Sequence, residues 1–217
     1  MSIIAFFGVL AAVFILLEIY PYVVSILGRS LSLQKIPEED RTIPNLATWT
    51  ILLVEGIIIA FSYYERNDFS NLWFYIALSL EYLIIATLSL WYGEHHRNGE
   101  PPFSRFDKIC LAGAGAGLLG WYLLGSWEIP IAIIIIVDGF GMAPTIEKTW
   151  RLPRSESFRA WTMTVAGSMC ALIALGPLQT WDFSRSAFTI YMMLITGIVW
   201  SMLFRRFQKW RTSSGII

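Results

Sequence analysis

Apolar residues occur in seven long runs, separated by shorter polar segments. Each run has about 20 residues, which is the length of α-helix that crosses roughly 30 Å of hydrocarbon. The pattern predicts seven transmembrane helices, over residues 3–28, 46–64, 72–92, 107–126, 129–148, 157–176 and 186–207. The first run is too long for a cleaved signal peptide and has no basic start, so we interpret it as the first helix of a bundle.

The composition agrees with a chain that lies almost wholly in a membrane. Hydrophobic residues make up 56% of the 217 positions, charged residues only 15%, and the mean hydropathy is +0.58. These values leave no room for a water-soluble domain. We therefore expect an all-α, polytopic membrane protein.

Basic residues follow the odd-numbered predicted helices. Fourteen of the sixteen Lys and Arg residues lie after helices one, three, five and seven, and only Arg66 and Arg185 lie on the other side. Cytoplasmic loops of membrane proteins carry an excess of Lys and Arg. The pattern predicts a multi-pass protein of the cell membrane with its N-terminus outside and its C-terminus in the cytoplasm.

Four carboxylic acids lie near the middle of four different apolar runs, with no basic residue at the same depth. They are Glu18, Glu55, Glu81 and Asp138. A charge at the centre of a bilayer costs about 2.5 to 3.5 kcal/mol on insertion scales. Such acids must be protonated, bound to a cation or hydrated for part of a working cycle. They predict a polar path for a solute, an ion or a proton.

Two parts of the chain share one order of features: an acid in the middle of a helix, a proline, a charged loop, and a Trp-Thr pair that opens the next helix. The two sets begin with Glu18, Pro21 and Trp49, and with Asp138, Pro144 and Trp161. The order predicts parallel three-helix repeats over residues 1–92 and 128–208. Residues 93–127 then hold a loop and a linker helix, and residues 209–217 form a cytoplasmic tail. The alternative is that apolar helices align by composition alone.

Two triplets joined by one helix, each with a proline in its first helix, resemble the SWEET and PQ-loop superfamily of small transporters. The resemblance covers nearly the whole chain at the level of topology. In place of the PQ dipeptide the chain has Pro21-Tyr22 and Pro144-Thr145, and its second helix has no proline. The resemblance implies alternating access around a site at the membrane midplane, and these departures point away from a sugar as the substrate.

The fifth predicted helix carries hinge residues just after its acid. Glycine is flexible, and proline removes a hydrogen bond from the turn before it, so Gly139, Gly141 and Pro144 predict a break in the helix beside a cavity. Helical spacing also predicts a polar stripe on one face, formed by Asp138, Gly141, Thr145 and Lys148. The alternative is a proline kink that packs against a neighbour, with Asp138 hydrogen-bonded to a Tyr or Thr.

The remaining acids differ in their surroundings. Glu55 lies on a polar face of the second helix, with Thr48 and Ser62 at seven-residue intervals. Glu81 shares its face with apolar residues, so it is either a functional acid or a neutral acid that ties the third helix to a neighbour. In the last helix, Thr196 is expected to line the same cavity as the acids.

Two tryptophans occupy equivalent places in the predicted repeats. Trp49 and Trp161 begin the second and sixth helices on the basic side. Anchoring at the membrane interface explains each one alone. Their equivalent positions predict a second role as paired gates, moving with hinges at Pro21 and Pro144. Between the fifth and sixth helices, Ser155 and Glu156 are interpreted as an N-cap and a first-turn acid.

These features favour a transporter of a small polar or cationic solute that works by alternating access and is coupled to protons. The alternative is a seven-helix receptor or assembly protein in which the buried acids are structural. The sequence contains no nucleophile–base constellation and no HExxH motif, so we expect no enzyme, and we expect no cofactor or metal. The expected partners are the solute, protons and membrane lipid, and we expect no nucleic acid.

Overall fold

The structure is a computed structural model that describes residues 2–29, 34–35, 37, 41–65, 69–93, 103–124, 128–181 and 183–213. In these ranges the chain is all-helical and has no β-strand. The seven α-helices are α1 (Ile3–Ile26), α2 (Leu46–Glu65), α3 (Phe69–Tyr92), α5 (Arg105–Leu124), α6 (Glu128–Arg151), α7 (Phe158–Ala174) and α8 (Phe183–Ser213). Short 3₁₀ turns, η2 (Pro153–Ser155) and η3 (Leu178–Thr180), flank α7.

The helix bounds lie within a few residues of the predicted ones, except at the end of α8. This helix continues to Ser213, so the expected cytoplasmic tail begins inside it. The added turns are rich in Arg, Lys and Gln, which are good helix formers and end the apolar run without ending the helix. In the described residues, three helical segments are long and apolar enough to cross a membrane: Ile3–Ile26, Asn71–Tyr92 and Ser186–Phe204.

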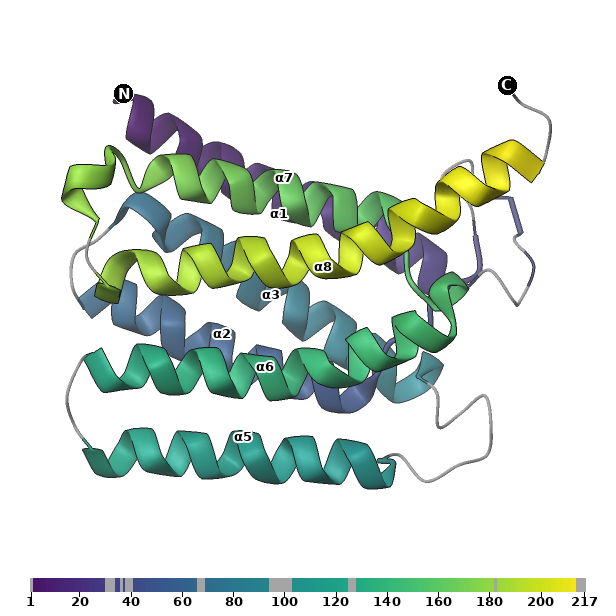
Figure 1. Cartoon of the computed structure of the whole chain (residues 1–217), viewed down its shortest axis with the longest axis horizontal. Coiled ribbons are helices and arrows are strands. Elements are labelled where there is room, and N and C mark those ends of the chain that lie inside the picture. The colour runs from purple at the N-terminus through teal and green to yellow at the C-terminus, as the bar shows by residue number, and fades with distance from the viewer. Residues whose placement is uncertain are drawn as a thin grey trace.

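Six of the helices form a closed ring. In order around it, α1 packs on α3, α3 on α2, α2 on α6, α6 on α8, α8 on α7, and α7 on α1. The remaining helix, α5, lies outside this ring against α6 and α2 (Figure 1). The ring places side chains from six helices around one interior.

The two halves of the ring have the same packing order. In the first triplet, α3 contacts both α1 and α2; in the second, α8 contacts both α6 and α7. The triplets meet where α1 packs on α7, which we call the α1·α7 seam, and where α2 packs on α6, the α2·α6 seam. At both seams the first helix of one triplet meets the second helix of the other.

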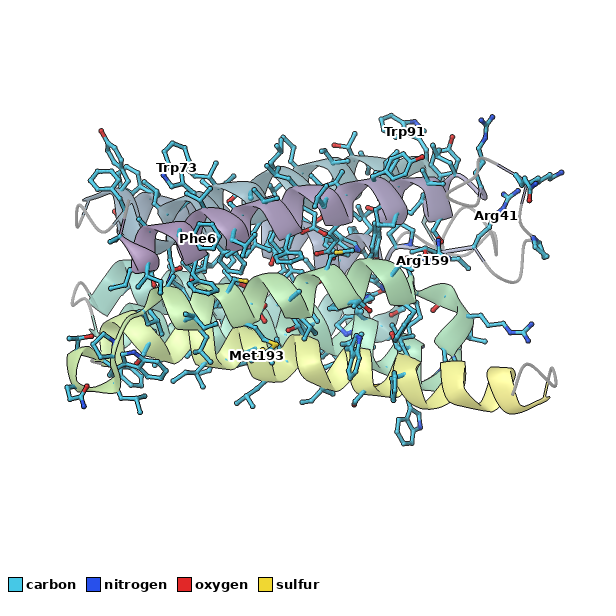
Figure 2. The ribbon with its side chains drawn as sticks, turned by 90° about the horizontal axis from the view of Figure 1, so that it is seen from above. Phe6, Arg41, Trp73, Trp91, Arg159 and Met193 are labelled. Atoms are coloured by element: carbon cyan, nitrogen blue, oxygen red, sulfur yellow. The ribbon has the colours of Figure 1, made fainter. Side chains whose placement is uncertain are left out.

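Successive helices run in opposite directions, so one end of the bundle collects the basic connections. At this basic end α1, α3, α6 and α8 finish, and α2, α5 and α7 start (Figure 1). Figure 2 shows Arg41 and Arg159 there, with Phe6 and Trp73 toward the opposite end. Arg66 and Arg97 lie outside the described residues.

The distribution of side chains is inverted relative to a water-soluble protein. Large apolar side chains cover the outer surface, among them Phe6, Leu17, Phe61, Trp73, Leu83 and Leu194. The four predicted acids are buried instead, with only 1–2% of each residue exposed. Because a soluble protein rarely exposes apolar patches of this extent, an apolar surrounding suits this surface.

The expected break in the fifth predicted helix is absent, and that prediction was wrong. The helix α6 is continuous from Glu128 to Arg151, with Pro144 inside it, and α1 is continuous through Pro21. A proline removes one hydrogen bond without ending a long helix, and bends it. Figure 1 shows that α6 bends near its C-terminal end. Gly141 has a packing role, because a Cβ there would lie 3.0 Å from the Ile51 side chain of α2.

Candidate functional site

The four buried acids form two pairs. Hydrogen bonds join the carboxyl group of Glu18 on α1 to that of Glu81 on α3, and the carboxyl group of Glu55 on α2 to that of Asp138 on α6. An ionised carboxylate can only accept a hydrogen bond, so a bond between two carboxyl groups requires a proton on one of them. Such a bond therefore exists in either pair only while one of its two members is protonated.

A hydroxyl group from the second triplet supports each pair. The Thr164 hydroxyl on α7 donates to Glu18 Oε1 over 2.5 Å, and the Tyr191 hydroxyl on α8 donates to Asp138 Oδ2 over 2.6 Å. Each pair therefore has one member that accepts a hydrogen bond from the second triplet.

The pairs occupy different places relative to the seams. Glu18 and Glu81 belong to the same triplet, whereas Glu55 and Asp138 face each other across the α2·α6 seam. The Tyr82 side chain on α3 is buried and interacts electrostatically with all four acids. The four acids and Tyr82 are therefore one connected polar cluster inside the ring, which we call the acid cluster.

The predicted polar stripe of α6 faces α2 and the residues just before α2. Its members are all buried, so in this conformation the stripe is part of the seam and not the wall of an open path. From mid-depth toward the basic end, the contacts are Asp138 with Glu55, Gly141 with Ile51 and Leu52, Thr145 with the Thr48 hydroxyl at 3.2 Å, and Lys148 with the Ile43 carbonyl.

A second polar cluster closes the basic end, centred on Glu156. Its carboxylate forms an ion pair with Lys148 at 2.7 Å and accepts hydrogen bonds from the Tyr22 hydroxyl at 2.7 Å and from Trp161 Nε1 at 3.1 Å. The Glu156 side chain is fully buried, and that of Lys148 is 4% exposed. Lys148 also donates to the Ile43 carbonyl. We call these five residues the basic-end latch.

The interpretation of Ser155 and Glu156 as the N-cap and first-turn acid of the next helix was wrong. Ser157 caps α7, because its side chain accepts a hydrogen bond from the backbone N–H of Ala160. Ser155 donates instead to the Leu152 carbonyl at 2.7 Å. The shift releases Glu156 from the helix terminus and lets it turn inward to Lys148.

Both predicted gate tryptophans lie in the interior, so interface anchoring does not describe them. Trp49 is 3% exposed and Trp161 is 4% exposed. The Trp49 ring lies 5.4 Å from the Tyr22 ring and 5.8 Å from the Tyr82 ring. Tyr22 thus connects Trp49 to the latch. The Trp49 ring packs between Tyr22 of the latch and Tyr82 of the acid cluster.

At the opposite end, aromatic rings from both triplets pack together, and the Tyr75 and Thr189 hydroxyls are hydrogen-bonded at 3.0 Å. Tyr63 of α2 lies 4.6 Å from Tyr75 of α3, whose ring lies 5.8 Å from that of Phe188 on α8. Phe188 lies 6.0 Å from Tyr191, the donor to Asp138. This aromatic cluster joins the first triplet to the second on the far side of the acids.

The remaining predicted residues have local roles. The Thr196 hydroxyl donates to the Met192 carbonyl of its own helix at 2.7 Å, which is a back-bond and not a contact with an acid. Gly139 lies beside Tyr191, since a Cβ there would be 3.8 Å from the Tyr191 hydroxyl oxygen. The structure therefore places the four acids and Thr145 in the interior of the ring, whereas the Thr196 hydroxyl is hydrogen-bonded within α8.

A cleft of about 460 Å³ opens beside the latch at the basic end. It lies between the start of α5, the end of α6 and the residue that precedes α2. Its lining is Asn45, Ser104, Arg105, Phe106, Asp107, Pro144, Glu147, Lys148, Arg151 and Leu152. Within the described ranges, no group of three or more His, Cys, Asp or Glu side chains could hold a metal ion.

Sequence reasoning did not identify the partners of the acids, which are Tyr82, Thr164 and Tyr191, or the bond from Tyr22 to Glu156 in the latch. Tyr and Thr are common in membrane helices, and nothing in their spacing along one helix shows which acid on another helix they reach. Glu156 carried one usable signal. It lies eight residues after Lys148, across a short helix–loop–helix connection, where opposite charges can meet.

Comparisons with protein-family models, with curated proteins and with solved structures gave no match to the chain. The function therefore has to be argued from the residues of the site and from their arrangement.

Proposed function

We propose that the chain is a membrane transporter that moves a small polar or cationic solute by alternating access and couples this movement to protons. Seven helices would span the membrane, with the N-terminus outside and the basic end in the cytoplasm. The observation that carries the proposal is the Glu55–Asp138 pair, two interacting acids buried at the seam between two triplets.

In this mechanism the triplets rock against each other at their two seams. Opening the α2·α6 seam separates Glu55 from Asp138 and brings water to both. An ionised acid is costly when buried but not when it is hydrated or next to a cation, so opening allows the shared proton to leave and a cationic group to take its place. Closing the seam around the new occupant carries it to the other side.

The arrangement of helices supports an architecture like that of the SWEET and PQ-loop superfamily. The same packing order in both triplets is what parallel repeats require, and α5 outside the ring suits a linker helix. Trp73 and Trp91 are exposed at opposite ends of α3. At about 1.5 Å per residue they are roughly 27 Å apart, close to the thickness of the hydrocarbon layer.

The chemistry of the acid cluster supports a polar or cationic solute. Acids provide charge for an ammonium or similar group, and the buried rings of Trp49, Tyr75 and Tyr82 provide faces for cation–π contact. An anionic solute would meet repulsion from the same acids.

Uptake by the purified protein in liposomes tests the proposal. Small amines, amino acids and polyols are offered outside the vesicles, with and without an imposed pH gradient. We expect accumulation of at least one cationic or zwitterionic solute that depends on the gradient. Absence of any gradient-dependent uptake or proton movement across the panel would count against transport.

The orientation has a separate test. Cysteines placed in residues 29–45, 93–106 and 149–156 should react in permeabilised cells and stay unlabelled by impermeant reagents in intact cells. Labelling of any of these segments from outside intact cells would overturn the proposed topology.

A second candidate function is a seven-helix receptor or assembly protein. It is favoured by one observation: each of the four acids is bound to a partner on another helix, as structural acids would be. In that case amide variants of the acids would lower stability, and the wild-type protein would move no solute.

A further inference from the structure

We propose that the basic-end latch is the gate that closes the cytoplasmic side of the path. The bonds from Tyr22 to Glu156 and from Lys148 to Ile43, which the Lys148–Glu156 ion pair holds in place, must break before the path opens there. The inference extends the proposed transport function. In this gate the charged side chains of Lys148 and Glu156 form the central contact. Trp161 donates to Glu156, and Trp49 packs behind Tyr22.

The latch joins the two triplets by contacts that cross between them. Tyr22 and Ile43 belong to the first triplet, and Lys148, Glu156 and Trp161 to the second. Tyr22 donates to Glu156, and Lys148 donates to the Ile43 carbonyl. A backbone hydrogen bond from the Ile43 N–H to the Ser155 carbonyl at 3.0 Å adds a third link. The triplets cannot part at this end while these bonds hold.

The latch also lies in the right place to control access. Moving inward along α6, Thr145 follows Lys148, and Asp138 lies two turns further. The Tyr22 ring packs on Trp49, which packs on Tyr82 beside the acids. From the other direction, Lys148 lines the cleft at the basic end. The latch and the Trp49 ring therefore lie between that cleft and the acid cluster.

A buried ion pair suits a gate because it holds firmly when complete and fails when one member is lost. Removing one partner leaves an uncompensated buried charge, which favours any state that lets water in. In the latch, loss of either charge also weakens a bond that crosses between the triplets, because Lys148 holds Ile43 and Glu156 holds Tyr22.

Access is measured with a cysteine at position 145, introduced as Thr145→Cys in a background carrying Cys110→Ala and Cys170→Ala. The protein is placed in lipid nanodiscs, and the rate of reaction with a positively charged methanethiosulfonate is recorded. Thr145 is fully buried beneath the latch, so the wild-type latch should give slow labelling. Each latch variant is checked by size-exclusion chromatography and thermal unfolding.

We expect Glu156→Gln to increase the labelling rate by at least about tenfold. The substitution destabilises the closed state and not the open one, so the population of the open state rises. Lys148→Met should have a smaller effect in the same direction, since Glu156 keeps its bonds from Tyr22 and Trp161. The double variant Lys148→Met with Glu156→Met loses both side-chain bonds that cross between the triplets, so it should be labelled at least as fast as Glu156→Gln.

The matched control is Glu147→Gln, which breaks the exposed Arg151–Glu147 ion pair on the same helix. It should change the labelling rate by less than about twofold, because exposed pairs contribute little. Equal labelling in Glu156→Gln and Glu147→Gln, or slow labelling in the double variant, would overturn the gate. Labelling does not depend on transport, so a working gate in a protein that moves no solute would refute the transport function alone.

Discussion

The two carboxyl pairs have nearly the same chemistry and different positions. Each joins two buried acids by a hydrogen bond, and each receives a hydroxyl donor from the second triplet. The Glu18–Glu81 pair, however, lies within one triplet, and the Glu55–Asp138 pair crosses the seam between triplets. A pair inside a rigid unit keeps its geometry when that unit moves, whereas a pair across a seam is made and broken.

This comparison separates two roles for buried acids in a membrane. In the proposed transport cycle, the first pair would tie α1 to α3 and keep its geometry, and the second would exchange its proton each time the seam opens. We therefore expect the number of protons moved in each transport cycle to depend on Glu55 and Asp138 and not on Glu18 and Glu81.

The largest expected effect is that of Asp138→Asn on transport. The amide keeps the shape and much of the hydrogen bonding of the acid but cannot ionise. We expect uptake to fall by at least about tenfold, equivalent to about 1.4 kcal/mol in the barrier, and the remaining uptake to lose its dependence on a pH gradient. The midpoint of thermal unfolding should move by less than about 4 °C. Wild-type uptake by this variant at every pH would remove Asp138 from the coupling mechanism.

The next prediction compares one acid from each pair. Glu55→Gln should reduce uptake nearly as much as the change at Asp138, because it removes the other half of the cross-seam pair. Glu81→Gln should keep uptake within about twofold of wild type and lower the stability by about 0.5–2 kcal/mol, through a weaker bond to Glu18. Uptake and unfolding in detergent are measured on both variants. A reversed order would place coupling inside the first triplet.

A smaller effect is expected from removal of the two hydroxyl donors. Tyr191→Phe deletes the donor to Asp138, and Thr164→Val deletes the donor to Glu18, with little change in volume. Each should cost about 0.5–2 kcal/mol of stability. Tyr191→Phe should also lower uptake several-fold, while Thr164→Val should leave it nearly unchanged. Equal uptake in the two variants would show that the donors do not distinguish the pairs.

The last prediction concerns stability alone, at one glycine of each seam. A Cβ at Gly167 on α7 would lie 3.3 Å from the backbone carbonyl oxygen of Ala11, whereas at Gly141 on α6 it meets only side chains, the nearest at 3.0 Å. Side chains can move where a backbone carbonyl cannot. Gly167→Ala should therefore destabilise by about 1–2 kcal/mol, and Gly141→Ala should be near neutral because helix propensity offsets crowding. Thermal unfolding of both variants gives the difference, and a larger loss for Gly141→Ala would contradict it.

The positions of the helices could be read from the chain because they follow from local properties. Seven apolar runs with polar ends specify where helices begin and end, and each observed bound lies close to its prediction except at α8, where polar helix formers extend the helix. Burial of the four acids was also foreseeable. Their place in the middle of apolar runs allowed no other environment than the interior of a bundle.

The way the acids combine was decided only by the tertiary structure. One helix wheel shows which residues share a face, but the rotation of each helix and the choice of its neighbours depend on packing against all the others. For this reason the sequence predicted one polar path for all four acids, whereas the folded chain divides them into a pair within one triplet and a pair across a seam. Glu156 shows the same limit. Its local sequence is typical of a helix terminus, and only the approach of α1, α6 and α7 at one end turns it into the buried centre of a latch.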